Sequence, residues 1–294
     1  PFNSYNMKYI AILLTVFNRK EKTIKCLQNI EAQSLPTDTK LDIYIVDGGS
    51  TDGTVETIKA QFPYVNIKTV DGVFWNRGMI EAWKMAEEKS RSGQKYDYYL
   101  WMNDDTFIYE DCIASLLRVS QSKEDKAIIL GSTLDTQTRS KLTYGGRDET
   151  GNVARPSSDD SPVRVVMMNG NIVLVPHNVY EKLGTLSSYY THARGDFDYG
   201  LRARKIGIKL WQVGHPLGEC DLHEHIDAWC DPEIPLKRRW KLMHRPNGMP
   251  PMEIFHLENQ HYGLRTAIFH FITIHLRCLF PNIWIKYKLS LIHI

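Results

Sequence analysis

Long apolar runs, which would mark membrane-spanning helices, are missing from this 294-residue sequence. The nearest candidate, Thr266–Leu276, contains two histidines and is bounded by Arg265 and Arg277, whereas a spanning helix needs about 20 apolar residues. No basic segment followed by an apolar one stands at the N-terminus, so we predict no signal peptide. We interpret residues 1–6 as a vector remnant before a natural start at Met7, and we expect a cytoplasmic protein.

Cysteine is also scarce in this chain. Five cysteines over 294 residues indicate reduced intracellular thiols and exclude a disulfide framework. Cys220, His223, His225 and Cys230 are residue types that bind zinc, but their C-x2-H-x-H-x4-C spacing matches no common structural zinc site. We therefore interpret them as ordinary thiols beside a histidine-bearing loop.

Two glycine-rich phosphate motifs are absent. No G-x-G-x-x-G follows a predicted strand, which argues against a dehydrogenase, and no G-x4-G-K-[ST] occurs, which excludes a P-loop enzyme.

Acidic residues are missing from position 259 onward. Residues 237–294 hold nine Lys or Arg against two acids, Glu253 and Glu258, whereas residues 1–236 hold 27 bases and 32 acids. The net charge of +2 therefore combines a slightly acidic body with a basic, aromatic tail.

Between residues 8 and 131, apolar runs of strand length alternate with stretches of helical period. The predicted strands are Tyr9–Val16, Leu41–Val46, Val65–Val70, Tyr96–Met102 and Ala127–Gly131. The predicted helices are Lys20–Gln33, Thr54–Gln61, Arg77–Ser90 and Glu110–Ser120. This alternation predicts an α/β fold with a mostly parallel central sheet flanked by helices.

The remainder of the chain is less regular. Residues 132–162 are predicted to form a long loop, followed by strands at Val163–Met168, Ile172–Val175 and Lys209–Val213 and helices at Asn178–Leu183 and Asp196–Ile206. Beyond residue 215 we predict an appendage with helices near 233–244, 251–261 and 264–278. The chain thus divides into residues 7–131, 132–215 and 216–294.

Carboxylates follow two of the predicted strands, at Asp47 and at Asp104–Asp105. Ligands of open parallel sheets bind beyond the carboxyl ends of the strands. Asp47 alone could simply form a turn, but the adjacent Asp104 and Asp105 repel each other unless a cation or hydrogen-bond donors balance them. A divalent cation held by carboxylates and phosphate oxygens is the usual solution, so we predict Mg²⁺ or Mn²⁺ here.

Four segments in this order resemble the inverting family-2 glycosyltransferases, which have the GT-A (Rossmann-like) fold. They are Thr15-Val16-Phe17-Asn18-Arg19, VDGGSTDGT from Val46 to Thr54, WMNDDT from Trp101 to Thr106, and GDFDYGLRARKIG from Gly195 to Gly207. The resemblance covers residues 8–215. It implies a nucleotide-diphosphate sugar bound by residues 7–131, an acceptor bound by residues 132–215, a divalent metal, and transfer to a hydroxyl with inversion.

The resemblance also implies roles for individual residues. Asp105 falls on the metal ligand of the family's D-x-D motif, in which Asn103 replaces the first Asp as in rhamnosyltransferase-like relatives. Asp196 falls on the general base, with Gly195 where the family has Glu. The residues on the donor side are Thr15, Phe17, Asn18, Asp47, Asp52, Trp75, Asn76, Gly78, Asn103 and Asp104. Those on the acceptor side are Asn169, Gly170 and Asp198.

Some of these assignments have structural alternatives. Asp196 could merely cap a helix, and Trp75 could be a core residue. In some relatives a histidine after the last strand reaches the metal or the diphosphate. His223 and His225 are candidates, with His223 preferred to His225, and a surface histidine is the alternative.

The basic tail has three interpretations. Its aromatic and basic residues suit an anionic membrane surface, but they would equally suit a helix packed on the body or a homodimer partner. Leu236 stands where processive synthases have the Gln of Q-x-x-R-W, which argues against a processive polymerase. Because the basic cluster is short and the body is acidic, we predict no nucleic-acid partner.

These observations predict a metal-dependent transferase acting on a lipid-linked saccharide acceptor in bacterial surface-polysaccharide (O-antigen type) assembly. One alternative is a sugar nucleotidyltransferase, which would need a glycine-rich, Arg-bearing loop after the first strand. A second alternative is a sugar-nucleotide-binding or scaffold protein without activity.

Overall fold

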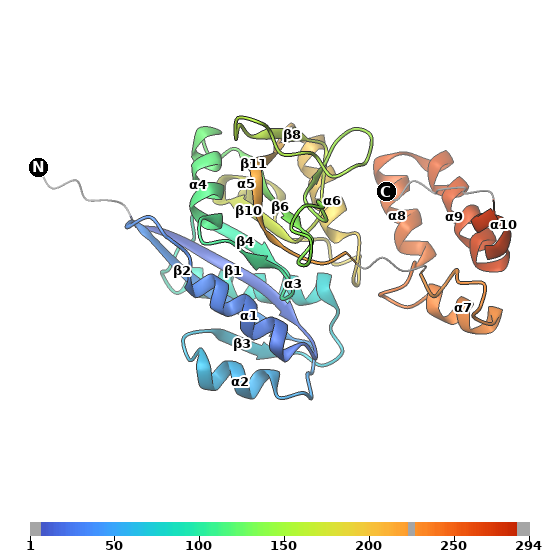
Figure 1. The fold of residues 1–294 in the computed structure, drawn as a ribbon, viewed down its shortest axis with the longest axis horizontal. Helices are drawn as coiled ribbons and strands as arrows, with labels where there is room; N and C mark the ends of the chain where they lie inside the picture. The colour runs from blue at the N-terminus through green and yellow to red at the C-terminus, as the bar shows by residue number, and fades with distance from the viewer. Residues whose placement is uncertain (1–6, 223–226, 287–294) are drawn as a thin grey trace, which may run out of the picture.

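The computed structural model describes residues 7–222 and 227–286. The presumed vector remnant, His223 and His225 lie outside the described residues. The fold is a central sheet covered by helices on both faces, with a helical appendage at one side (Figure 1).

The first half of the sheet is parallel, as predicted. Its strands lie in the order β3-β2-β1-β4. They span Asn66–Thr69 (β3), Thr39–Asp47 (β2), Lys8–Val16 (β1) and Tyr98–Met102 (β4). Residues Ile10–Leu14 of β1 are fully buried because helices cover both faces of this strand, which explains its continuous apolar sequence.

The second half of the sheet contains a reversed strand. β10 (Ile172–Pro176) runs antiparallel to both β4 and β6 (Ala127–Leu134), whereas β11 (Lys209–Glu219) runs parallel to β6. Two short antiparallel strands, β5 (Phe107–Ile108) and β8 (Val163–Val165), complete the sheet on β11. The sheet is therefore mostly parallel, and the reversal brings the start of β10 to the edge where β4 ends.

The helices that flank the sheet form two layers, and each layer packs on one face of the sheet through its own hydrophobic cluster. The helices α1 (Lys20–Glu31), α2 (Thr54–Gln61) and α4 (Cys112–Ser122) contribute to the cluster on one face. The helices α3 (Trp75–Arg91), α5 (His177–Leu183) and α6 (Gly195–Lys205) contribute to the other. This arrangement confirms the predicted α/β class.

The structure differs from the predictions mainly in short or irregular elements. β5, β7 (Gly146–Arg147) and the last helix, α10 (Pro281–Lys286), were not predicted. The predicted strand Val163–Met168 is divided into β8 and β9 (Met167–Met168), and β9 pairs with β7 in a small separate sheet. β11 continues six residues past the predicted end, because its ladder with β6 resumes after register shifts at Pro216 and Gly218. Proline and glycine there had marked the end of the strand in the sequence.

The appendage consists of α7 (Leu236–Met243), α8 (Pro251–His261), α9 (Leu264–Leu279) and α10. It has a small core of its own, formed by Trp229, Cys230, Met243, Ile254, Ile274 and Cys278. Figure 1 shows α8 on the side nearest α6, with α9 and α10 farther from the sheet. In the part of the chain that is described, no helix has both the length and the apolar character needed to cross a bilayer.

All five cysteines are free and buried. The absence of disulfides in the structure agrees with the small number of cysteines in the sequence.

Candidate active site

The predicted site residues come from strand ends that share one edge of the sheet. In the register of β1 with β2, Val16 pairs with Asp47, and in that of β10 with β4, Ile172 pairs with Met102. Residues 15–18, 47 and 103–105 therefore lie at the same edge as residues 169–171. Sites of open α/β sheets form at such edges.

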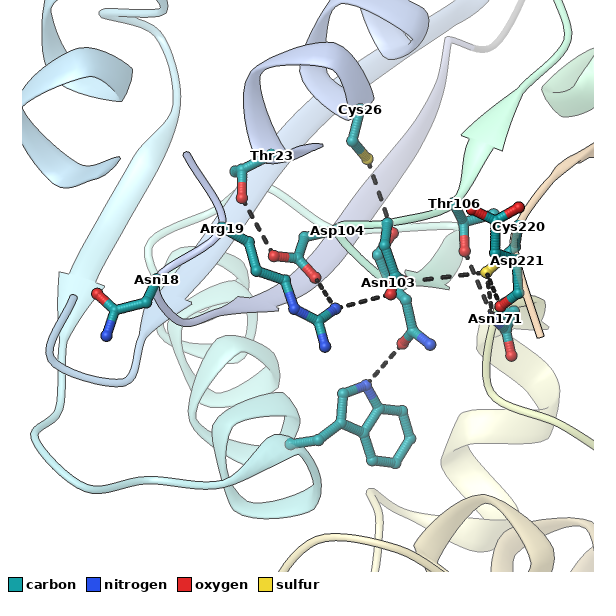
Figure 2. Close-up of polar contacts among 12 residues, drawn as sticks. Asn18, Arg19, Thr23, Cys26, Asn103, Asp104, Thr106, Asn171, Cys220 and Asp221 are labelled. Atoms are coloured by element: carbon teal, nitrogen blue, oxygen red, sulfur yellow. Dashed lines mark hydrogen bonds and ion pairs between the residues drawn. The ribbon is translucent and has the colours of Figure 1, made fainter. Parts of the chain in front are cut away.

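Arg19 bridges the two adjacent aspartates at this edge, and Figure 2 shows its guanidinium beside Asp104. Its Nη1 lies 3.2 Å from Oδ1 of Asp104 and 2.7 Å from Oδ2 of Asp105. Thr23 Oγ1 donates a further hydrogen bond, of 3.1 Å, to Oδ2 of Asp104. Both carboxylates are buried, with Asp104 4% and Asp105 8% exposed.

Burial is the largest single influence on the pKa values of Asp104 and Arg19. Desolvation raises the pKa of Asp104 to about 6, although the attraction of Arg19 acts in the opposite direction. For Arg19, burial alone would lower the pKa, but the attraction of both aspartates reverses that effect and the pKa of the guanidinium is raised. Two carboxylates sharing one cation remain short of positive charge.

Asp105 is also held from the end of β11. Cys220 Sγ, at the end of β11, lies 3.9 Å from Oδ1 of Asp105. Asn171 Nδ2 approaches Cys220 Sγ and Thr106 Oγ1, both at 3.5 Å (Figure 2). Burial raises the pKa of Cys220 to about 12, so this group stays a neutral thiol at pH 7.

The donor set fits a hard divalent cation that the protein holds only in part. Asp104 and Asp105 offer carboxylate oxygens, and they need more positive charge than Arg19 supplies. Among the described residues, no group of three or more His, Cys, Asp or Glu side chains could enclose a metal. A cation bound here would thus complete its shell with phosphate oxygens and water, as Mg²⁺ commonly does.

Asp47 has the turn-forming role that the sequence left open. Its fully buried carboxylate accepts the backbone N–H of Gly49 at 3.0 Å and that of Ser50 at 3.1 Å. Its predicted contact with a nucleobase stays a prediction.

Asn18 and Asp52 link the turn after β1 to the turn after β2. Asn18 has a left-handed φ of 48°. Its N–H donates to Ser50 Oγ and its Oδ1 accepts the N–H of Thr51, both at 2.8 Å. Asp52 accepts the N–H of Lys20 at 3.0 Å. These hydrogen bonds fix the loop in which Phe17 is 55% exposed, where its ring is available to stack on a base.

Thr15 and Gly78 form the contact that brings α3 onto β1. A Cβ at Gly78 would lie 2.4 Å from Thr15 Cγ2, so only glycine allows this approach. The helix start, at Trp75, is thereby brought to the site edge.

Trp75 joins the part of the site formed by residues 7–131 to the part formed by residues 132–215. Its Nε1 donates to Oδ1 of Asn103 at 2.8 Å. Its ring packs against Gly170, where a Cβ would come within 2.8 Å of Cζ2. The backbone N–H of Gly170 in turn donates to Oδ2 of Asp196 at 2.9 Å. Trp75 is partly buried, and its indole N–H makes a polar contact in the site.

Asp196 begins α6 with its carboxylate held by backbone. Gly170 binds one oxygen, and the N–H of Phe197 donates to the other at 2.9 Å. Burial raises the pKa of Asp196, while these hydrogen bonds and the charge of Arg194 act to lower it. Arg194, the residue before this helix, has a left-handed φ of 76°, and such backbone strain often occurs at functional sites.

Asn76 explains why glycine stands before Asp196. Asn76 is fully buried and donates to the carbonyl oxygens of Ser187 and Tyr190 at 2.9 and 2.7 Å. A Cβ at Gly195 would lie 1.7 Å from Oδ1 of Asn76. The Glu of the family motif thus has no room in this chain.

Asp198 points away from the other site residues. It is 1% exposed and binds Arg202 Nε at 2.8 Å and His261 Nε2 at 2.9 Å. Its carboxylate joins α6 to α8 of the appendage. The predicted contact of Asp198 with an acceptor stays a prediction. Both oxygens of its carboxylate already have partners within the protein.

Asn169 lies beside a pocket in the acceptor half. Its Oδ1 accepts Arg147 Nε at 3.2 Å. Arg147 lines an open pocket of about 830 Å³ together with Arg155, Arg164 and Leu222. The attraction of Asp196 raises the pKa of Arg147, but burial outweighs it, so the pKa is lowered overall. Arg147 therefore lines the pocket and also interacts electrostatically with Asp196.

Arg19 and His192 are among the residues of this site that carried no predicted role. Arg19 stood in the first motif, directly after a strand end, and its basic charge near the aspartates could have drawn attention. His192 accepts the N–H of Trp75 at Nδ1 over 3.4 Å and packs edge-on against Phe74, with ring centroids 5.8 Å apart. Burial lowers the pKa of His192. Nothing in the sequence around His192 indicated that its loop folds back onto α3.

The architecture is shared with solved glycosyltransferase-like structures. A structure of Staphylococcus aureus TarS 1–349 in complex with UDP superposes with a TM-score of 0.54 at 11% identity, covering 74% of this chain and 61% of TarS 1–349. A second TarS 1–349 structure gives a TM-score of 0.53 at 11% identity over 90% of this chain and 72% of TarS 1–349. At this identity the likeness concerns the fold, which is GT-A. In the first comparison, the chain spans less than two thirds of TarS 1–349.

The sequence identifies the family. The family model for glycosyl transferase family 2 matches residues 11–171, more than half of the chain. The protein therefore belongs to glycosyl transferase family 2. No curated protein of similar sequence was found.

Proposed function

We propose that this protein is a metal-dependent inverting glycosyltransferase. It moves a sugar from a nucleotide-diphosphate sugar to a hydroxyl of a lipid-linked saccharide in polysaccharide assembly. The donor lies at the edge formed by β1, β2 and β4, and the acceptor lies on the side of Asn169, Gly170 and Asp196.

One observation carries the proposal: Trp75 lies between Asn103, which precedes the carboxylate pair, and Gly170, which binds Asp196. The contacts run from Asn103 through the indole to Gly170 and on to Asp196. Family-2 glycosyl transfer needs a charged donor site and a base that face each other. A single aromatic residue in contact with both sides supports that arrangement.

The residues of the chain divide the chemistry between them. Asp105, with Asp104 beside it, would hold a divalent cation, which when bound neutralises charge on the leaving diphosphate. Arg19, whose side chain is 43% exposed, can turn its guanidinium toward the same phosphates. Asp196 accepts the proton of the acceptor hydroxyl while that oxygen bonds to the anomeric carbon and the bond to the diphosphate breaks on the opposite face.

The solved relative supports the type of donor. TarS 1–349 was obtained in complex with UDP, a nucleoside diphosphate. The crosslinked turns of residues 18–20 and 50–52, with the exposed ring of Phe17, form a surface on which a nucleobase can rest.

The proposal is tested with a panel of nucleotide-diphosphate sugars incubated with Mg²⁺, Mn²⁺ or a chelator, with donor hydrolysis and transfer to saccharides as readouts. We expect one class of donor to be consumed in a metal-dependent way. The anomeric configuration of the product, measured by NMR, should be opposite to that of the donor. Retained configuration, or turnover unaffected by the chelator, would contradict the proposal.

Two variants test the assigned residues. Asp196→Asn should abolish transfer while donor binding persists, because the amide cannot accept the proton. Asp105→Ala should weaken metal-dependent donor binding. Glu149→Gln, which removes an exposed carboxylate outside the site, is the control and should behave as wild type.

A further inference from the structure

The outer surface of the appendage is apolar where a helix would ordinarily be polar. The exposed apolar side chains of α9 and α10 are Leu264, Ile268, Phe269, Ile272, Leu276, Leu279, Phe280, Ile283 and Ile285, with exposures from 37% to 60%. Ile268, Ile272 and Leu276 follow a four-residue spacing, which aligns them along one side of the helix. We call these nine residues the outer α9–α10 face.

The opposite side of α9 already has its partners. Ala267, Ile274 and Cys278 are buried, the last two of them in the core of the appendage. The outer α9–α10 face therefore adds a second apolar surface to a helix whose packing within the protein is complete. Exposed apolar patches of this size mark contacts with a partner or a membrane.

The charged side chains of α7, α9 and α10 are all basic, while Asp227, Asp231 and Glu233 precede these helices. Between residues 237 and 286 the acids are Glu253 and Glu258, and both are engaged inward. Glu253 accepts from Thr191 Oγ1 at 2.7 Å, and Glu258 is 2% exposed and pairs with His270. The exposed bases are Lys237, Arg238, Lys241, Arg245, Arg265 and Lys286. Anionic headgroups would complement this charge.

α7 extends the basic surface along α9. Trp240 is 42% exposed, and its ring lies 5.4 Å from that of His275 on α9, between centroids. The exposed bases of α7 thus lie on a helix that packs beside α9. Tryptophan next to basic residues and an apolar helix face is typical of interfacial segments.

We propose that the outer α9–α10 face, with the bases of α7, binds the surface of an anionic lipid bilayer. A second copy of the chain fits this surface less well. A two-fold interface places the same patch on both sides, so it would bring these bases against each other with no acid on α7, α9 or α10 to offset them. An anionic bilayer satisfies the apolar area and the charge together.

The contacts between the appendage and the body fix the position of the outer α9–α10 face. α8 docks on the body through the stacked rings of Tyr189 and His256, 3.7 Å apart, and through His261 with Asp198. Arg194, two residues before Asp196, contacts Met249 Sδ at 3.4 Å. The outer α9–α10 face is thereby fixed relative to the acceptor half. That it would bring a lipid-linked acceptor to Asp196 rests on the proposed function, whereas bilayer binding itself does not.

The test uses the full chain in a co-sedimentation assay with vesicles of phosphatidylcholine alone and of phosphatidylcholine with phosphatidylglycerol. We expect binding to the phosphatidylglycerol vesicles that weakens as salt is raised. Ile272→Asp should lower the partition onto these vesicles by about tenfold or more, because it removes apolar area and adds a repelled charge. Phe269→Ser, which adds no charge, should lower it in the same direction.

Ile206→Asp is the matched control, since Ile206 is 54% exposed but lies on the body at the end of α6. It should bind vesicles as wild type does. Equal sedimentation with both vesicle types, unchanged binding by Ile272→Asp and Phe269→Ser, or a stable dimer in light scattering that Ile272→Asp dissolves would each overturn the proposal. Donor hydrolysis measured without lipid keeps the two proposals apart. It should be equal in Ile272→Asp and wild type, and its absence from wild type would count against the transferase alone.

Discussion

At the scale of single residues, the site holds three carboxylates with few positive charges beside them. Arg19 is shared by Asp104 and Asp105, and Asp196 is held chiefly by backbone N–H groups. Burial raises the pKa of Asp104 and that of Asp196. The protonation of these groups is therefore where the site is most sensitive.

The pH dependence of transfer should report Asp196. Its pKa is raised by burial, and it acts as a base only when ionised. Activity is therefore lost as pH falls through the folded-state pKa, which lies above the ordinary Asp value of about 3.9. A pH profile of kcat/KM on wild type, compared with Glu149→Gln, checks this. An acid limb at or below the ordinary value would contradict it.

Replacing Arg19 should expose the repulsion between its two partners. Arg19→Ala removes the guanidinium that lowers the pKa of Asp104, so ionising this buried carboxyl costs more and the free energy of unfolding should fall more at pH 7 than at pH 5. Arg19→Lys retains a positive charge and should show a smaller loss. Denaturant titrations of both variants at the two pH values measure this, and an equal loss at both would argue against the electrostatic account.

At the scale of elements, two glycines determine how helices meet the site. Gly78 lets α3 approach Thr15 of β1, and Gly195 lets the start of α6 approach Asn76 of α3. Both are contacts between elements distant in sequence. α3 is consequently the element that positions Trp75 between the two halves.

Gly195→Ala should destabilise the protein by about 1–3 kcal/mol, as overpacking in a tight contact does. The added Cβ would meet Oδ1 of Asn76, which two backbone carbonyls hold in place. Gly200→Ala is the control on the same helix, since its Cβ would meet the flexible side chain of Met168 at 3.2 Å. Chemical denaturation of both variants distinguishes them, and equal stability would show that Asn76 can move aside.

At the scale of the whole molecule, one of the contacts that anchor the appendage to the body is a buried polar group. Asp198 binds Arg202 on its own helix and His261 on α8, and both His261 and Asp198 have side chains that are 1% exposed. Tyr190, which lies 3.4 Å from Asp198 at its hydroxyl, belongs to the same group. The charges near His261 are those of Asp198, Arg202 and Lys205.

This anchor should make stability depend on pH. Burial lowers the pKa of His261, and the hydrogen bond to Asp198 offsets this in part. The unfolded chain therefore takes up the proton first, so the stabilisation is present above about pH 6.5 and is lost as pH falls through the lowered folded-state value. His261→Gln should reduce this dependence in denaturant titrations from pH 7 to 5, whereas His244→Gln, at an exposed histidine, should not. An unchanged slope in His261→Gln would contradict the assignment.

The strand and helix pattern of residues 8–131 could be predicted because it is local. Continuous apolar runs such as Tyr9–Val16 indicate strands buried on both faces, and the turn residues after them indicate where they end. α2 was predicted to the residue. The pairing of Arg19 with Asp104 and Asp105, and of Gly195 with Asn76, could not be predicted, because each depends on which strands lie side by side.

The sequence by itself determined that the chain is an α/β protein with carboxylates at strand ends and a basic tail without acids after position 258. These properties follow from periodicity and composition, which act locally. Only the tertiary structure decided that β10 runs antiparallel, that Trp75 joins the two halves, that Asp198 serves the appendage, and that α9 turns an apolar side outward. Those outcomes depend on the register of strands and on the approach of helices far apart in sequence, and packing in three dimensions sets both.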